Sequence, residues 1–324
     1  MLSTRVGVFL LSFLGTVVMG PLLIPALRKL KFGQPIREDG PATHLKKAGT
    51  PTMGGLIFLV PAMLILCILS FEYRGVLPLL ILTIGFGAVG FLDDYIKIIR
   101  KNKDGLSMSH KTIGLVAVSA AFVFYLVYVV DIGTGIYLPL TGMARIVEIP
   151  RLVYIPFSIF VFYATTNSVN LTDGVDGLAS GVTLIVMIFF TVVAATRAEH
   201  SEIMLYTAII AGGCLGFLVF NFHPAKVFMG DCGALALGGA VAAAAIVLRV
   251  HWAILFTGII YVLEALSDVI QVVSYKTRRK RVFKMAPLHH HFELSGWKET
   301  KVFAVFCSVT LVFSVIGLLL LFLG

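Results

Sequence analysis

Long apolar segments recur along the whole chain, and they limit it to one class of fold. Most reach 18 residues, enough for a helix to cross a bilayer while bonding its own backbone polar groups. We predict ten spans, which are Val6–Leu27, Met53–Ser70, Gly75–Leu92, Thr112–Val130, Leu152–Thr165, Leu178–Ala195, Ile203–Phe220, Gly233–Leu248, Trp252–Val273 and Val302–Leu323. The expected fold is therefore an all-α integral membrane protein with ten transmembrane helices, the fifth of them short.

The composition agrees with a single polytopic membrane domain over residues 1–324. Charged residues make up 13% of the chain, about half the share in a soluble domain. The first apolar segment lacks a small-residue cleavage site and leads into a basic loop, so we expect a retained helix. The four cysteines, Cys67, Cys214, Cys232 and Cys307, are scattered. Their spacing predicts neither a disulfide framework nor a paired metal site.

Basic residues are concentrated in alternate loops. Of the 26 Lys and Arg residues, 20 lie in or beside the odd-numbered loops. Because positive residues stay in the cytoplasm, we expect these loops to be cytoplasmic and both termini to lie outside. Membrane topology is then the preferred explanation of the net charge of +9. The same residues could also attract an anionic substrate. Nucleic-acid binding is not expected, because the chain has no basic, aromatic-rich soluble module.

Five aspartates fall on the predicted cytoplasmic boundary. Asp93 and Asp94 end the third span in FLDDY, Asp173 and Asp176 lie in NLTDGVDG, and Asp231 lies in MGDCG. Clustered carboxylates at a membrane boundary are costly unless they are paired, hydrated or bound to a cation. Oxygen ligands together with substrate phosphates suit Mg²⁺. We therefore expect a site for Mg²⁺ and phosphate at this boundary.

Each aspartate motif also has a purely structural explanation. The Asp-Asp pair could end a solvated helix, although acids at a helix C-terminus oppose its dipole. The segment LTDGVDG could be a turn before a helix start, since Asp and Gly favour turns and caps. In MGDCG, the flanking glycines would let backbone approach a phosphate closely. These alternatives remain open at the level of the residues.

Two further loops carry polar motifs. In PLHHHFE, three adjacent histidines on a regular helix could not all face one ion, so phosphate or sugar contact is preferred over zinc, with a solvated loop as the alternative. In HLKKAGTPTMGG, the Walker spacing is absent, and a polar cradle beside Lys47 is expected. Glu264 and Asp268 lie four apart inside the ninth span, on one helical face. We interpret them as polar contacts within the bundle or a helix break.

Five motifs together resemble a known family. GTPTMGG, FLDDY, NSVNLTDGVDGLASG, NFHPAKVFMGDCG and PLHHHFE occur in the order typical of the phospho-N-acetylmuramoyl-pentapeptide transferases, within the polyprenyl-phosphate N-acetylhexosamine-1-phosphate transferases. The resemblance covers essentially the whole chain, and TPTMGG and PLHHHFE are its sharper marks. One departure is Cys232, where Thr or Val is usual in the family.

The resemblance implies a ten-helix enzyme of the bacterial inner (cytoplasmic) membrane with a cytoplasmic active-site cleft. Such an enzyme transfers phospho-MurNAc-pentapeptide from UDP-MurNAc-pentapeptide to undecaprenyl phosphate, giving lipid I and UMP in peptidoglycan synthesis. It also implies Mg²⁺ on the diphosphate and a homodimer. Phosphoryl transfer depends mainly on positioning and charge neutralisation, which fits the expected site.

The resemblance also implies roles for individual residues. Asp93, Asp94 and Asp231 would be catalytic, with Asp231 as metal ligand and Asp93 as base or nucleophile, in a one-step or two-step mechanism. The implied substrate-binding residues are Lys47, Asn170, Asp173, Asp176, Asn221, Phe228, His289, His290 and His291. Among them Lys47, Asn221 and Phe228 would form the uridine pocket beside Asp176, with Phe228 stacking on uracil. Asn170, Asp173 and His290 would form the adjoining polar pocket.

Two other functions are compatible with part of this sequence pattern. A sister transferase that uses UDP-GlcNAc or a related sugar would share the acids, but PLHHHFE speaks against it. A transporter or ion channel would use Glu264 and Asp268, the acids within a predicted span. A transporter commonly shows internal repeats, and the sequence has none that we recognise.

Overall fold

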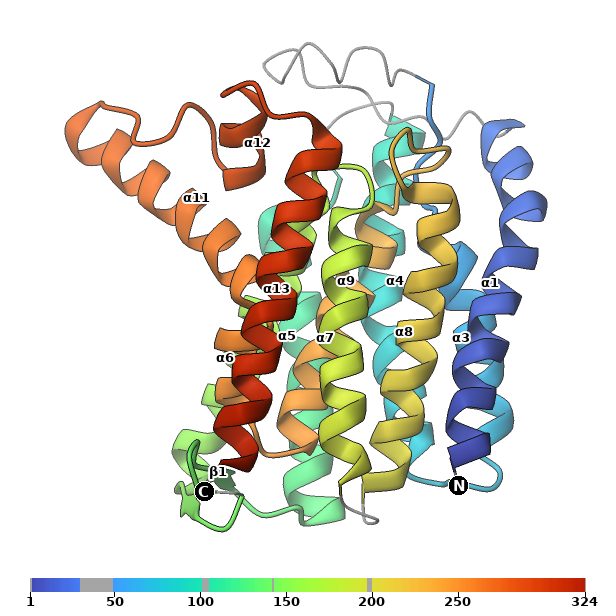
Figure 1. Cartoon of the computed structure of the whole chain (residues 1–324), viewed down its shortest axis with the longest axis vertical. Coiled ribbons are helices and arrows are strands. Elements are labelled where there is room, and N and C mark those ends of the chain that lie inside the picture. The colour runs from blue at the N-terminus through green and yellow to red at the C-terminus, as the bar shows by residue number, and fades with distance from the viewer. Residues whose placement is uncertain (1, 30–48, 101–104, 142, 197–199, 324) are drawn as a thin grey trace.

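The computed structural model describes residues 2–29, 49–100, 105–141, 143–196 and 200–323. Its long helices, apart from the slanted α11 (Ile259–Arg278), run side by side along one direction (Figure 1). They are α1 (Leu2–Lys29), α3 (Leu56–Leu69), α4 (Val76–Arg100), α5 (Met108–Phe124), α6 (Arg151–Thr172), α7 (Leu178–Ala195), α8 (Ser201–Asn221), α9 (Gly230–Val247), α11 (Ile259–Arg278) and α13 (Glu299–Phe322). The shorter elements are η1 (Tyr125–Val130), η3 (His251–Ala253), α10 (Ile254–Thr257), α12 (Leu288–Glu293), β1 (Gly135–Tyr137) and β2 (Ile146–Glu148).

The chain is a multi-pass membrane protein. In the ranges that the structure describes, eight helices are long and apolar enough to cross a membrane, and the bent pair α10–α11 would make a ninth. Helix α3 is apolar but has only 14 residues. Each of the ten predicted spans overlaps one of these helices. That all ten cross, and on which side each loop lies, stays a prediction.

Helices α8 and α9 form the centre of the bundle, while α1 and α13 lie at its edge. About nine-tenths of the apolar window of α9 is buried (89%), against 28% in α1. Small residues allow the central contacts, because they let helix backbones approach closely. A Cβ on Gly212 of α8 would lie 2.2 Å from the carbonyl oxygen of Phe9 on α1. The Gly- and Ala-rich sequence of α9 suits the same close packing.

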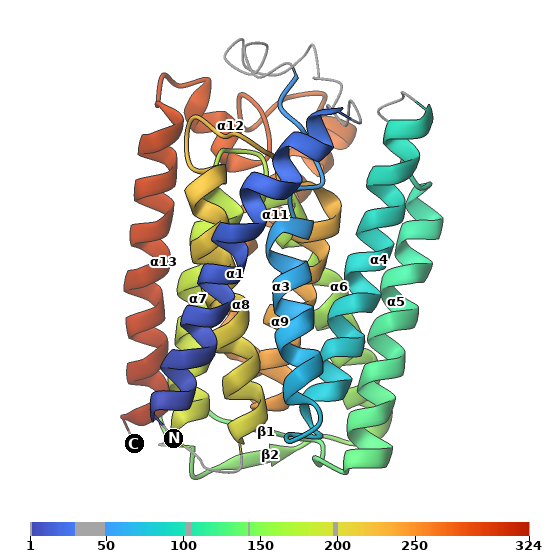
Figure 2. The ribbon, with the colours of Figure 1, turned by 90° about the vertical axis from the view of Figure 1, so that its right-hand side faces the viewer.

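The two ends of the bundle differ. Helix α1 begins and α13 ends at one end, where β1 pairs antiparallel with β2 (Figure 2). We call this the hairpin end. At the opposite end, α4 and α6 end and α7, α9 and α13 begin (Figure 1). We call it the site end, since it carries the aspartate motifs.

Three predicted helix boundaries at the site end were wrong. Helix α4 continues eight residues beyond Leu92 to Arg100, so Asp93 and Asp94 lie within it. The fifth span is not short, since α6 has 22 residues and reaches Thr172. Helix α9 starts at Gly230, which places Asp231 in its first turn. An apolar run ends at the first acid or polar side chains, whereas a helix continues through them when they are paired inside the bundle, as Asn167 and Asn170 are in α6.

The ninth predicted span is broken. Helices α10 and α11 meet at an angle of 84°, and α11 leans away from the bundle before the chain returns through α12 (Figure 1). The bend lies at Gly258, whose N–H donates to the carbonyl of Ile254. It therefore precedes Glu264, and the bend does not arise at that residue.

Candidate active site

The acids of α4 face the start of α9. Asp93 and Asp94 are 3% and 1% exposed. The two helices can meet here because residue 90 is glycine: a Cβ at Gly90 would lie 2.2 Å from the carbonyl oxygen of Asp231. Close backbone contact thus brings the FLDDY and MGDCG motifs together.

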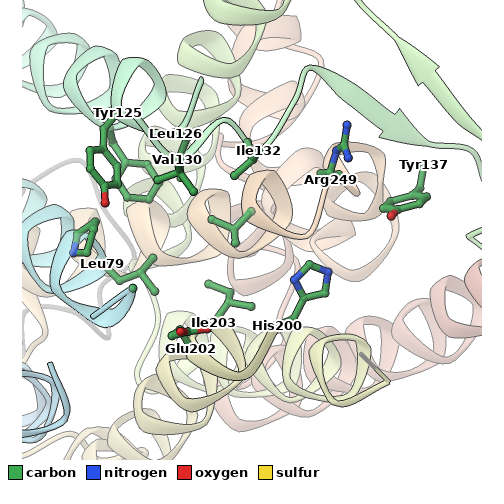
Figure 3. Close-up of a pocket in the computed structure, with 14 residues that line it drawn as sticks. Leu79, Tyr125, Leu126, Val130, Ile132, Tyr137, His200, Glu202, Ile203 and Arg249 are labelled. Carbon is green, nitrogen blue, oxygen red and sulfur yellow. The ribbon is translucent and has the colours of Figure 1, made fainter. Parts of the chain in front are cut away.

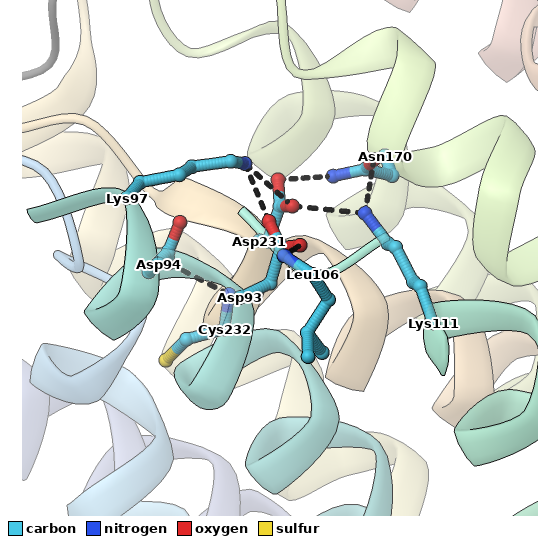
Figure 4. A network of polar contacts seen from close by, with 8 residues as sticks. All are labelled: Asp93, Asp94, Lys97, Leu106, Lys111, Asn170, Asp231 and Cys232. Carbon is cyan, nitrogen blue, oxygen red and sulfur yellow. Dashed lines mark hydrogen bonds and ion pairs between the residues drawn. The ribbon is translucent and has the colours of Figure 1, made fainter. Parts of the chain in front are cut away.

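Three helices place polar side chains around Asp231. Lys97 of α4 and Lys111 of α5 approach its Oδ2 at 2.9 and 2.8 Å. Asn170 of α6 donates through Nδ2 to Oδ1 at 2.8 Å. Figure 4 shows these side chains converging on Asp231 from different sides. Both oxygens of Asp231 are therefore engaged by charge-assisted hydrogen bonds, which are stronger than neutral ones.

Asp94 caps α9 from the neighbouring helix. Its Oδ2 accepts from the backbone N–H of Cys232 at 3.0 Å (Figure 4), where the free N–H groups and the helix dipole favour negative charge. Gly230 has a φ of +74°, and a Cβ there would lie 2.5 Å from the same oxygen. The buried Oδ1 of Asp94 has no hydrogen-bond partner among the described residues. One oxygen of Asp94 is thus structural, and the other is left for a ligand.

Asp93 is held by its own helix and by the loop after it. Its Oδ1 accepts from the backbone N–H of Leu106 at 2.9 Å, and its Oδ2 forms an ion pair with Lys97, four residues along α4. Lys97 therefore links Asp93 to Asp231. That i,i+4 pair places a cation between two carboxylates.

The three carboxylates could hold a divalent cation. Ligand atoms of Asp93, Asp94 and Asp231 lie within 4.8 Å of one another. The donors are all oxygens, as Mg²⁺ prefers, and the unpartnered Oδ1 of Asp94 is a ready ligand. Asp231, by contrast, already bonds two ammonium groups and an amide, so a cation on it would compete with them.

Asp173 follows the last residue of α6 and faces the same cluster. Desolvation raises the pKa of its carboxyl well above the ordinary value of 3.8, and the negative charge of Asp231 raises it further. The nearby backbone N–H of Gly230 lowers this pKa. Asp173 therefore lies at the start of α9, beside the carboxylates rather than in open solvent.

Asp176 and Asn221 organise the neighbouring loop. Asp176 accepts from His223 Nδ1 at 2.9 Å and from the backbone N–H of Ala225 at 3.0 Å. Asn221 accepts from the backbone N–H of Gly177 at 3.1 Å and donates to the carbonyl of Val227 at 2.9 Å. Both are buried. Their observed contacts thus fix the chain that leads from α8 to α9.

Glu299 of α13 joins this loop. Its Oε2 accepts from the backbone N–H of Asp176 at 3.3 Å and lies 3.7 Å from His223 Nδ1. Ligand atoms of Asp176, His223 and Glu299 lie within 4.8 Å of one another. The group ties the start of α13 to the loop around Asp176.

The TPTMGG segment pairs with the chain before α9. The backbone N–H of Phe228 donates to the carbonyl of Pro51 at 2.9 Å, and the N–H of Gly54 donates back to Phe228 at 2.8 Å. The N–H of Gly55 donates to Met229 at 2.8 Å. Half-buried Phe228 is thus placed between two motifs. Lys47, the other predicted uridine contact, lies outside the described residues.

The three histidines of PLHHHFE point in different directions, as their adjacency predicts. His289 is buried against Glu264, with Nδ1 3.1 Å from Oε2. His290 bonds Glu293 of its own helix at 2.9 Å. His291 accepts from the backbone N–H of Lys284 at 3.1 Å. The interpretation of Glu264 as a polar contact within the fold is confirmed, and its pairing leaves little support for an ion path.

Sequence reasoning missed four site residues. Lys97, Lys111, His223 and Glu299 all contact predicted site residues, yet the two lysines counted only as cytoplasmic charges and the other two were not considered. The spacing of Lys97, four residues after Asp93, was the usable signal. Contacts between α5 and α9, or between α13 and the loop at Asp176, have no signature in a single sequence.

A separate cavity lies at the hairpin end, away from the acids. It has a volume of about 370 Å³, and its lining includes Leu79, Tyr125, Leu126, Ile203 and Arg249 (Figure 3). Arg249 is already engaged, donating to the carbonyl of Gly135 at 3.0 Å. The lining is mostly apolar and includes none of the predicted site residues.

Comparison with known proteins gives a consistent result. The model of the family described as "Glycosyl transferase family 4" matches residues 76–249, and "Phospho-N-acetylmuramoyl-pentapeptide-transferase signature 1" matches residues 47–59. Similar proteins called phospho-N-acetylmuramoyl-pentapeptide-transferase occur in several bacteria. The protein of Acetivibrio thermocellus is 52% identical over 98% of this chain and 95% of its own length. Those of Clostridium kluyveri and Pelotomaculum thermopropionicum are 49% and 48% identical, each over 96% of this chain and 97% and 96% of their own.

Proposed function

The chain belongs to the phospho-N-acetylmuramoyl-pentapeptide-transferase family, and from that membership we propose that it transfers phospho-MurNAc-pentapeptide from UDP-MurNAc-pentapeptide to undecaprenyl phosphate. The products are lipid I and UMP, in peptidoglycan synthesis. The protein is a transferase. A bacterial cytoplasmic membrane would supply the lipid acceptor, the cytoplasm would supply the nucleotide, and a homodimer is the expected assembly.

The arrangement around Asp231 carries this proposal. Two lysines and an amide converge on one carboxylate at a helix N-terminus, with two more carboxylates within 4.8 Å. Phosphoryl transfer needs positioning and neutralisation of spread negative charge rather than much covalent chemistry. Helix N-termini and ammonium groups are the elements that bind phosphates. In this site, the ammonium groups of Lys97 and Lys111 contact Asp231 in the first turn of α9.

The same residues fit Mg²⁺. Asp94 Oδ1 and the carboxylate of Asp231 would hold it, with Asp93 in the same group. When bound, the ion supplies Lewis-acid stabilisation of charge on the diphosphate and on the leaving UMP. Lys97 and Lys111 neutralise Asp231 in the observed arrangement, and both ammonium groups lie where they could turn to phosphoryl oxygens.

Asp93 is the proposed base or nucleophile. The acceptor is a phosphate monoester, whose second pKa is about 6, so at neutral pH a base has little proton to remove. The observed contacts give Asp93 a further task, because its carboxylate holds Lys97 between itself and Asp231. Asp93 would hold Lys97 in this way whether the acceptor attacks the donor directly or Asp93 first forms a covalent intermediate.

The nucleotide would bind beside the acids. We assign uracil stacking to Phe228, whose backbone is held by Pro51 and Gly54. Asp176 and Asn221 would act mainly by fixing the loop that presents Phe228, and Lys47 completes the proposed uridine pocket. Asn170, Asp173 and His290 are assigned to the polar pocket for the sugar-phosphate side.

Donor-dependent UMP release tests the function. Protein in detergent receives undecaprenyl phosphate and Mg²⁺ with either UDP-MurNAc-pentapeptide or UDP-GlcNAc. We expect UMP from the muramoyl donor only, and loss of that signal in Asp231→Asn. UMP from UDP-GlcNAc instead would assign the chain to a sister activity. Folded protein that releases UMP from neither donor would contradict the proposal.

A further inference from the structure

A buried carboxylate outside the aspartate cluster has a specific partner. Glu264 of α11 is 0% exposed, and His289 of α12 is 1% exposed. Glu264 Oε2 lies 3.1 Å from His289 Nδ1, and Oε1 accepts from the backbone N–H of the same residue at 3.3 Å. Both oxygens therefore hold one residue, which fixes its backbone as well as its ring.

This double contact determines which nitrogen of His289 is available. An ionised carboxylate only accepts hydrogen bonds, so Nδ1 carries a hydrogen and donates it to Glu264. The hydrogen bond at one ring nitrogen sets the state and the orientation of the other. Nε2 then carries the free lone pair of the ring and can accept a hydrogen bond from a ligand.

The Nε2 atom faces the aspartate loop. A Cβ on Gly174 would lie 2.1 Å from Nε2, so the ring packs directly against this glycine. Gly174 directly follows Asp173, in the loop that joins α6 to α7. His289 Nε2 is buried and has no hydrogen-bond partner among the described residues. Because buried polar atoms nearly always have partners, a bound molecule is the expected partner.

We propose that Glu264 is a positioning residue of the transferase: it holds His289 so that Nε2 accepts a hydrogen bond from a hydroxyl or N–H group of the bound nucleotide-sugar. The inference rests on the proposed function. It differs from a structural role, in which Glu264 would only attach α12 to α11 and Nε2 would contact no substrate. A structural role affects folding, whereas a positioning role affects the turnover of folded enzyme.

The first variant is Glu264→Gln, which keeps the shape of the side chain. The amide oxygen can still accept from the backbone N–H of His289, so the NH₂ group turns to Nδ1 and reverses the tautomer. We expect kcat for UMP release to fall roughly 10- to 100-fold, as for a misplaced catalytic group, with KM for the nucleotide changed less than about twofold. Asp268→Asn, one turn along α11, is the matched control and keeps the wild-type kcat.

The second variant approaches His289 from the other side. Gly174→Ala leaves Glu264 intact but places a methyl group where Nε2 lies, and we expect a similar loss of kcat. Since both changes act through one atom, the Glu264→Gln/Gly174→Ala double variant should be no slower than the slower single variant.

Several outcomes would overturn the inference: wild-type kcat in Glu264→Gln, losses that multiply in the double variant, or a fall in kcat that follows the melting temperature. If Glu264→Gln does not fold, Gly174→Ala decides, and wild-type kcat in that variant overturns the inference. Wild-type protein that releases no UMP would instead contradict the proposed function itself.

Discussion

At the scale of single residues, one substitution of Asp94 can separate its observed contact with α9 from its proposed contact with a metal ion. Asp94→Asn keeps an oxygen to cap α9 at Cys232 but loses the charge on Oδ1. We expect it to melt near the wild-type temperature and to lose most UMP release. Asp94→Ala loses the cap as well, which costs about 1 kcal/mol, and should melt lower. A thermal-shift assay beside the UMP assay measures both effects. Equal melting temperatures would contradict the capping role.

Asp173 gives a prediction about pH. The pKa of its carboxyl in the folded protein is raised above the unfolded value of 3.8. Ionisation of Asp173 therefore destabilises the fold at pH values above 3.8, and this penalty is absent at lower pH. Asp173→Asn should therefore raise the melting temperature, more at about pH 8 than at about pH 5. Asp131→Asn at the hairpin end is the control. An equally large rise in melting temperature at the lower pH would contradict the raised pKa of Asp173.

At the scale of elements, the approach of α4 to α9 is the feature on which the site depends. Gly90→Ala would place a methyl group 2.2 Å from the carbonyl oxygen of Asp231 and force the helices apart. Gly87→Ala, one turn earlier on α4, finds its nearest neighbour at 3.7 Å, which is ordinary contact. We expect folded Gly90→Ala protein to lose UMP release and Gly87→Ala to retain it. Full activity in Gly90→Ala would show that this contact is not needed.

The helices were predictable from the sequence because apolar length alone predicts a span. Their ends at the site were not, because Asp93, Asp94 and Asp231 look like loop residues until their partners are known. The family motifs indicated which acids gather, and the structure brings those of the described part together. The roles of Lys97, Lys111, Glu299 and Glu264 depend on contacts between distant helices. Apart from the i,i+4 spacing of Asp93 and Lys97, no spacing in one sequence encodes such contacts.

At the scale of the whole molecule, the charge asymmetry predicts the orientation in the membrane. The site end should face the cytoplasm and the hairpin end the outside. With exposed Cys67 replaced by Ser, we expect an impermeant maleimide to label Glu148→Cys on β2 in intact cells. Lys280→Cys, beyond α11, should react only after the membrane is opened. Labelling of Lys280→Cys in intact cells would show that the protein has the opposite orientation.

The central claim is that the carboxylates at the junction of α4 and α9 hold a divalent cation against a diphosphate. Mn²⁺ binding to the detergent-solubilised protein, followed by electron paramagnetic resonance with and without UDP, tests it most directly. We predict one ion per chain, bound more tightly with UDP and lost in both Asp231→Asn and Asp94→Asn. Unchanged Mn²⁺ binding in both folded variants would contradict the claim and place the metal elsewhere.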